Sequence, residues 1–173
     1  MSQQIETPTA QQSPMEVKPQ PQHRWLQRLV GEWTYEFEPM SPDQPGAKAA
    51  GVERVRKVGD LWVVAESEGQ MPGSGPITMM VTLGYDPAKK KFVGSWIGSM
   101  MTEFWVYEGD LDAAERVLTL SSTGPSMKGD GSTAQYQDVI ELASDDRRIF
   151  TARILDDDGT WKQMMRAEYR RTK

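Results

Sequence analysis

Residues 31–38 read GEWTYEFE, and this short stretch decides the fold class. Its aromatic residues Trp33, Tyr35 and Phe37 alternate with polar residues. Successive side chains of a β-strand point to opposite faces, so the alternation predicts a strand with one buried face. Nine similar short runs follow, most of them separated by polar, turn-prone residues. These runs cover residues 50–58, 61–69, 77–85, 91–99, 103–109, 116–122, 134–142, 148–155 and 161–170.

Ten short strands joined mostly by tight turns predict an all-β fold, an up-and-down antiparallel β-barrel. Closure of the sheet removes its exposed edges, which favours a barrel over an open meander. A two-sheet sandwich is the alternative, but its crossovers need longer connections than most of these. Residues 22–30 carry an apolar stripe at helical spacing and predict about two turns of helix covering one mouth of the barrel.

The first 21 residues differ in composition from the rest of the chain. They are rich in Gln, Pro, Ser and Thr, and few of them are apolar. Such a segment buries too little surface to offset its chain entropy, so we expect residues 1–21 to be disordered and residues 22–173 to form a single domain. Neither a signal peptide nor a membrane span is expected, and we expect a cytoplasmic protein.

Composition excludes several kinds of site. The chain has no cysteine, which rules out disulfides, thiolate nucleophiles and zinc–thiolate centres. It has one histidine, which rules out a multi-histidine metal centre. The net charge of -5 argues against nucleic acid as a partner. We therefore expect no metal site.

The two ends of the predicted barrel resemble the signature of the lipocalin and fatty-acid-binding-protein superfamily. Gly31 and Trp33 form a Gly-x-Trp at the start of the first strand, and an arginine ends the last. In that superfamily the tryptophan packs beneath the barrel against a C-terminal arginine. Strand parity selects Arg171 for this structural role in barrel closure. The face that Arg171 continues holds Trp161, Met165, Ala167 and Tyr169.

Several blocks resemble a bacterial family known as domain of unknown function 1579. The blocks are LGYDP at 83–87, FVGSWIGSMM at 92–101, WVYEG at 105–109, YQDVIE at 136–141 and DGTW at 158–161. The resemblance covers about residues 23–172. It implies a lipocalin-like barrel, and it supplies no catalytic residue because no activity is established for that family.

Alternation along the strands predicts which side chains line the interior. Trp96, Tyr107, Asp138, Met165 and Tyr169 each have apolar neighbours two residues away, so we expect them to point into one internal space. Asp138 and the tyrosine hydroxyls are the groups that could orient the polar end of a ligand there.

Glu66 is a further cavity candidate. It shares a face with Trp62 and Val64, although the opposite face of that strand is equally apolar. An acid inside a barrel is costly unless it is paired or hydrogen-bonded. Glu66 and Asp138 could hold a ligand, act as a general acid or base, or pair with Arg54, Arg56 or a tyrosine.

Three methionine pairs occur within or beside the predicted strands, at 79–80, 100–101 and 164–165. Parity predicts that one member of each pair faces inward, which would give either a soft cavity wall or ordinary core filling.

Haem is not expected. Nitrobindin-like haem barrels hold haem through a histidine on the closing strands, where this chain has QMMR at 163–166. The single histidine, His23, precedes the barrel. No other cofactor is indicated by a motif.

The leading hypothesis is a soluble barrel that binds a small, mostly apolar molecule in its interior. The alternatives are a barrel-based isomerase or hydrolase that uses inward carboxylates, and an interaction module with a solid barrel. Homo-oligomerisation stays open, and neither nucleic acid nor a membrane is an expected partner.

Overall fold

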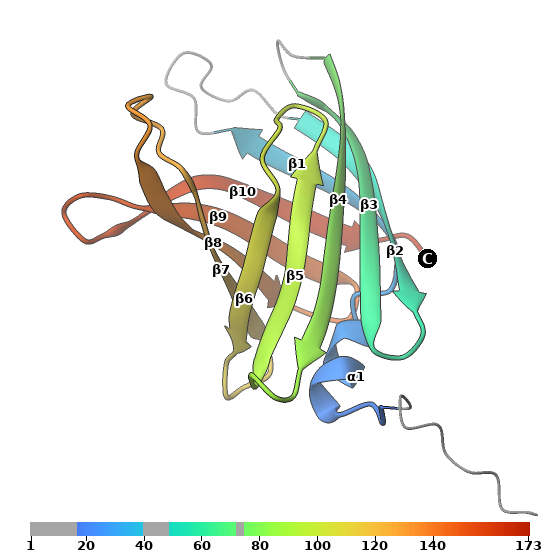
Figure 1. Ribbon diagram of the computed structural model, residues 1–173. Helices are drawn as coiled ribbons and strands as arrows, with labels where there is room; N and C mark the ends of the chain where they lie inside the picture. The colour runs from blue at the N-terminus through green and yellow to red at the C-terminus, as the bar shows by residue number, and fades with distance from the viewer. Residues whose placement is uncertain (1–16, 40–48, 72–74) are drawn as a thin grey trace, which may run out of the picture.

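The structure is a computed structural model that describes residues 17–39, 49–71 and 75–173. It contains one short helix followed by ten strands (Figure 1). The elements are α1 (Pro21–Gln27), β1 (Gly31–Pro39), β2 (Ala49–Val58), β3 (Trp62–Met71), β4 (Gly75–Asp86), β5 (Lys91–Gly98), β6 (Trp105–Leu111), β7 (Val117–Pro125), β8 (Thr133–Leu142), β9 (Arg147–Leu155) and β10 (Trp161–Arg171).

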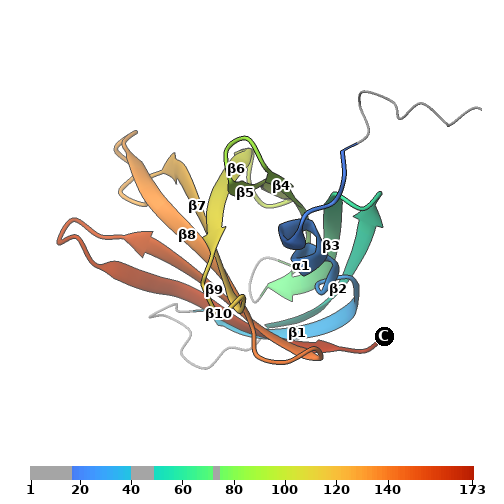
Figure 2. The same ribbon diagram turned by 90° about the horizontal axis from the view of Figure 1, so that it is seen from below.

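The strands form one closed antiparallel barrel. Each strand pairs with its neighbours in sequence, and β1 pairs with β10 to complete the ring (Figure 2). The predicted up-and-down barrel is therefore confirmed, and the sandwich alternative is wrong. The ladders differ in length: β3 and β4 share ten residue pairs, whereas β6 and β7 share only four, from Glu108–Ser121 to Leu111–Leu118. Beyond these four pairs the ribbons of β6 and β7 diverge (Figure 1).

Strand β1 shows why the alternating sequence closes a barrel. Trp33, Tyr35 and Phe37 are buried, while Thr34 and Glu36 are exposed. The aromatic face belongs to the hydrophobic core inside the barrel, and the polar face is in water. The sequence pattern of residues 31–38 is thus reproduced by the burial of its side chains as far as Phe37.

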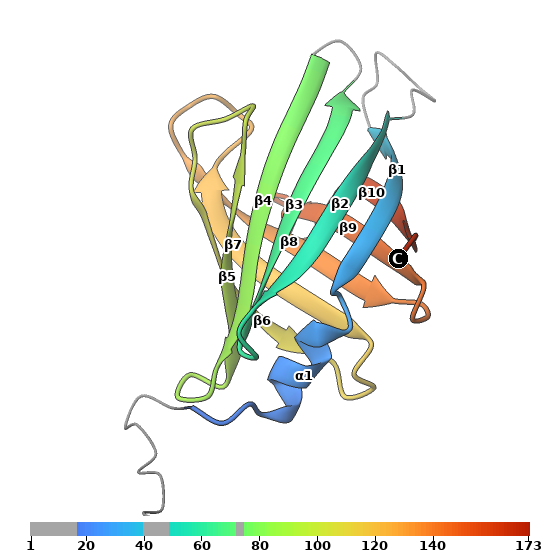
Figure 3. The same cartoon turned by 90° about the vertical axis from the view of Figure 1, so that its right-hand side faces the viewer.

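Helix α1 lies at the lower end of the barrel (Figure 3). Trp25 and Leu26 are buried in the core, and the Trp25 indole donates to the carbonyl of Glu115 at 2.8 Å. His23 is also buried: Nδ1 accepts from the Gln20 amide at 2.9 Å, so Nε2 is the nitrogen that can donate to the Tyr85 carbonyl 3.1 Å away. The helix is shorter than the predicted 22–30, because after Gln27 the chain continues in tighter turns up to Val30.

A β-bulge in β10 overturns part of the predicted parity. The register with β9 shifts between Gln163 and Met165, so Met164 is an extra residue. Met164 and Met165 both line the interior, where one of the two was expected. The shift also reverses the face of Trp161, which stacks on the outward-facing Arg153 with the guanidinium carbon 5.4 Å from the ring centroid.

The predicted disordered tail, residues 1–21, lies mostly outside the described residues, and its last residue, Pro21, begins α1. Within the described ranges, no helix has the length and apolar character needed to cross a membrane.

Candidate ligand-binding cavity

The barrel encloses a cavity of about 260 Å³. Leu29 and side chains from strands β2 to β10 line it. This volume lies just below the roughly 300–1,000 Å³ typical of small-molecule pockets. Most of the lining is apolar, and three of the lining side chains are ordinarily charged, namely Glu53, Asp138 and Arg148.

Five of the residues selected from the sequence lie on the wall of this cavity: Trp96, Tyr107, Asp138, Met165 and Tyr169. They come from four strands: Trp96 from β5, Tyr107 from β6, Asp138 from β8, and Met165 and Tyr169 from β10. The cavity thus brings together residues that are up to 73 positions apart in the sequence.

Glu66 does not line the cavity, and the prediction that it does is wrong. Its side chain is 44% exposed and lies 3.8 Å from the Arg56 guanidinium on the outer surface. Both faces of β3 are apolar in sequence, but its neighbours Ala65 and Ser67 are the residues that point inward. Glu66 therefore belongs to an exposed ion pair.

Asp138 and Tyr107 are hydrogen-bonded to each other inside the barrel. The Tyr107 hydroxyl donates to Asp138 Oδ2, and no hydrogen bond reaches Asp138 Oδ1 from any described residue. Burial raises the pKa of Asp138 to about 6, although the bond from Tyr107 lowers it in part. Burial, and then the neighbouring carboxylate, raise the pKa of Tyr107, which therefore stays protonated. Asp138 thus lines the cavity with one carboxylate oxygen that has no hydrogen-bond partner among the described residues.

A buried ion pair that the sequence did not reveal lies lower in the barrel. Arg148 of β9 pairs with Glu53 of β2, and each side chain is only 7% exposed. Ser67 donates to the second oxygen of Glu53 at 2.8 Å. The Arg148 guanidinium carbon also lies 4.3 Å from the centroid of the Tyr169 ring. Burial lowers the pKa of Arg148 to about 10, so it keeps its charge at neutral pH and neutralises Glu53.

One sequence signal could have identified Arg148. It shares strand parity with Phe150 and Ala152, and both of these line the cavity.

Arg148 also lies far from Asp138 along the barrel. Asp138 pairs with Ala152, and Arg148 pairs with Leu142. The two charged groups are therefore four residues apart, which is about 13 Å along a strand.

The lower end of the barrel is closed around Trp33. The guanidinium carbons of Arg171 and Arg148 lie 4.2 and 4.5 Å from the centroid of its ring. Arg171 also donates to the backbone carbonyls of Arg28, at 2.8 Å, and Val30. Gly31 has a φ of 143°, and a Cβ atom there would collide with Arg171. Arg171 thus joins β10, Trp33 and the turn after α1.

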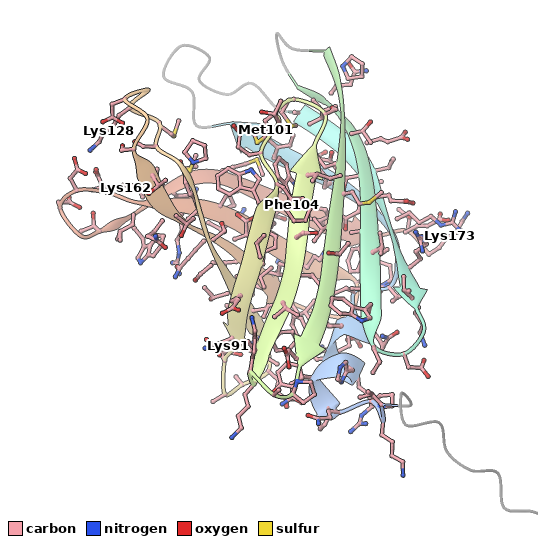
Figure 4. All side chains as sticks on the ribbon, viewed as in Figure 1. Lys91, Met101, Phe104, Lys128, Lys162 and Lys173 are labelled. Carbon is pink, nitrogen blue, oxygen red and sulfur yellow. The ribbon has the colours of Figure 1, made fainter. Side chains whose placement is uncertain are left out.

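Toward the upper end, where the β6–β7 ladder has ended, the side chain of Trp105 lies between the two strands. The ring of Trp105, on β6, lies against Gly124 of β7, in the space that a Cβ atom would fill. Its centroid is 4.9 Å from that of the Tyr136 ring, on β8. Its indole donates to Met101 Sδ at 3.3 Å. Figure 4 shows Met101 at the end of the barrel opposite Lys91.

No group of three or more His, Asp or Glu side chains in the described ranges is arranged to hold a metal ion. His23 is in α1, and its two ring nitrogens face Gln20 and Tyr85 rather than the cavity. The expectation that this barrel holds no haem stays a prediction.

Residues 18–171 match the family described as "Protein of unknown function (DUF1579)". No curated protein matches the chain. Among solved structures, the crystal structure of Rv2717c from M. tuberculosis is similar with a TM-score of 0.58 and 12% identity, covering 90% of this chain and 100% of that chain. A redesigned β-barrel is similar with a TM-score of 0.46 and 13% identity, covering 87% of this chain and 96% of that chain. At such identities the likeness to Rv2717c shows the fold alone.

Proposed function

We propose that this chain, which belongs to the DUF1579 family of proteins of unknown function, binds one small, mostly apolar molecule inside its barrel. The observation that carries the proposal is the cavity of about 260 Å³ inside the barrel, with Leu29 from the turn after α1 and Trp105 of β6 among its lining. An apolar space with a few polar groups is the usual form of a small-molecule site.

The walls favour an apolar occupant. Many of the residues that line the cavity have aliphatic side chains, among them Val55, Val63, Val81, Leu83 and Leu120. Each methylene group that a ligand transfers from water to such a surface contributes about 0.8 kcal/mol. Met79, Met164 and Met165 add side chains that can adjust to the shape of the ligand.

The charges favour binding over hydrolysis by paired carboxylates. That chemistry needs two inward acids with unlike environments. Of the described residues, the acids that line the cavity are Glu53 and Asp138, and Glu53 is already neutralised by Arg148. Asp138 therefore remains as a single acid, which suits the orientation of a ligand better than a two-acid reaction.

The test measures binding of 2-phenylethanol, a small uncharged aromatic alcohol, by isothermal titration calorimetry and ligand-observed NMR. We expect saturable binding at one site. Ala65 lines the cavity, so Ala65→Trp places a large side chain inside it and should abolish binding. The matched control is Ala50→Trp, which adds the same side chain at an exposed position of β2. Equal binding by both variants, or none by the unmodified protein, would overturn the proposal.

A further inference from the structure

The charges on the cavity wall do not cancel. Of the three ordinarily charged side chains there, Glu53 and Arg148 form a mutual ion pair. Asp138 has no cationic partner among the described residues, and its only hydrogen bond comes from the neutral Tyr107 hydroxyl. When Asp138 is ionised, the cavity therefore carries one uncompensated negative charge. A buried charge of this kind is unfavourable unless something pairs with it.

Aromatic side chains gather in the same part of the cavity. Trp96 and Trp105 are direct cross-strand partners on β5 and β6, and Tyr107 follows two residues after Trp105. Tyr136 precedes Asp138 by two residues on β8, and its ring meets that of Trp105. All four rings line the cavity. Aromatic faces carry partial negative charge and attract organic cations, most strongly those of tryptophan.

We propose that the cavity binds a small organic ammonium ion, with the cationic nitrogen at Asp138 Oδ1 and among these four rings. This inference rests on the proposed function and names its ligand class. Two separate observations support it: a carboxylate oxygen with no hydrogen-bond partner in the described part of the chain, and a group of aromatic rings that line the same cavity. An anionic ligand would instead meet the carboxylate of Asp138, and Arg148 is already occupied by Glu53.

The other titratable groups near Asp138 do not supply the missing positive charge. Tyr107 faces it from β6, and Tyr169 is close enough on β10 to sense its charge. Burial raises the pKa of Tyr169 to about 12, so both tyrosines are neutral at physiological pH. Arg148 is four residues further down the barrel. The pKa of Asp138, about 6, leaves its carboxyl group ionised at pH 7.5 and able to pair with a cation.

The experiment compares three ligands of similar size that differ in charge: 2-phenylethylamine, 2-phenylethanol and phenylacetate. At pH 7.5 we expect the amine to bind about tenfold more tightly than the alcohol, because it adds a charged hydrogen bond. Phenylacetate should bind more weakly than the alcohol. Between pH 7.5 and pH 5 the advantage of the amine should shrink as Asp138 takes up a proton, while binding of the alcohol should change little.

Two variants assign the preference to its two proposed sources. Asp138→Asn keeps an acceptor for the Tyr107 hydroxyl, so the variant should still bind the alcohol. Because it removes the negative charge, its affinity for the amine should fall close to its affinity for the alcohol. Trp105→Leu should weaken binding of benzyltrimethylammonium, which has no N–H to donate, by about threefold. The outer-face variant Glu66→Gln removes an exposed acid and should leave the preference unchanged.

The outcomes separate the two proposals. If 2-phenylethanol binds but the amine has no advantage, or keeps its advantage in Asp138→Asn, the ammonium inference is wrong and the binding function stands. If phenylacetate binds best, Arg148 rather than Asp138 recognises the ligand, and the inference is overturned. If none of the three ligands binds, the proposed function fails.

Discussion

Replacing Asp138 with asparagine should stabilise the protein, and the gain should depend on pH. The pKa of Asp138 rises from 3.8 to about 6 on folding because of burial. The folded state therefore binds more protons than the unfolded state in this range, and the stability contributed by the protonated group is lost as the pH rises from about 4 to 6. A shift of this size corresponds to about 3 kcal/mol in the free energy of unfolding.

Asp138→Asn should consequently match the stability of the unmodified protein near pH 3.8 and exceed it by up to about 3 kcal/mol at pH 7.5. For a chain of this length the gain corresponds to about 6–12 °C in melting temperature. The quantity compared at each pH is the difference in free energy of unfolding between the variant and the unmodified protein. The other acids are common to both proteins, so their contributions cancel in this difference. Urea denaturation followed by tryptophan fluorescence, from pH 4 to 8, provides the measurement.

Glu66→Gln is the matched control, because Glu66 lies on the outer surface in a half-exposed ion pair. Its effect should stay below about 1 kcal/mol at every pH. A gain for Asp138→Asn that is the same at pH 4 and pH 7.5, or a loss at pH 7.5, would show that the charged carboxylate is not destabilising in the fold.

Two further predictions concern the closed end of the barrel. Arg148→Met leaves Glu53 buried without its partner, so it should lower the free energy of unfolding, measured in urea, by about 3–5 kcal/mol. Adding Glu53→Gln should restore part of the loss. Strictly additive effects of the two substitutions would show that Glu53 and Arg148 are not coupled. Arg171→Met removes the bonds to two backbone carbonyls and the stack on Trp33, so it should destabilise by about 2–3 kcal/mol and speed amide hydrogen exchange in α1. Unchanged exchange in α1 would contradict the role of Arg171 in holding the turn after the helix.

Alternation in the sequence was sufficient to predict the barrel, because most strands bury one face only. The prediction from alternation failed in the strands that do not bury a single, regularly alternating face. Both faces of β3 are apolar, so Glu66 was placed on the wrong face. In β10 the extra residue Met164 reverses the parity of everything before it, and Trp161 was placed inside when it stacks on Arg153. A bulge of this kind has no signature in a single sequence.

The candidate site was predicted in part for the same reason. Tyr107 and Asp138 were both expected in the interior, but their hydrogen bond depends on the register of three strands. Arg148 was missed because it follows Asp145, Asp146 and Arg147, so it reads as the end of a polar turn. Its partner Glu53 is 95 residues earlier in the chain, and only the closed barrel brings the two together.

The four-pair ladder between β6 and β7 has a consequence for the time that a ligand stays bound. Exchange through a fully paired barrel wall requires strands to separate, which is slow because many backbone hydrogen bonds break together. Above Glu108 and Ser121 these two strands share no such pairs, and the Trp105 ring lies between them. Entry and release there would require rotation of the half-buried Trp105 side chain, rather than the micro- to millisecond motions of whole elements. Residence time would then follow the strength of the contacts with the ligand, and not the rigidity of the barrel.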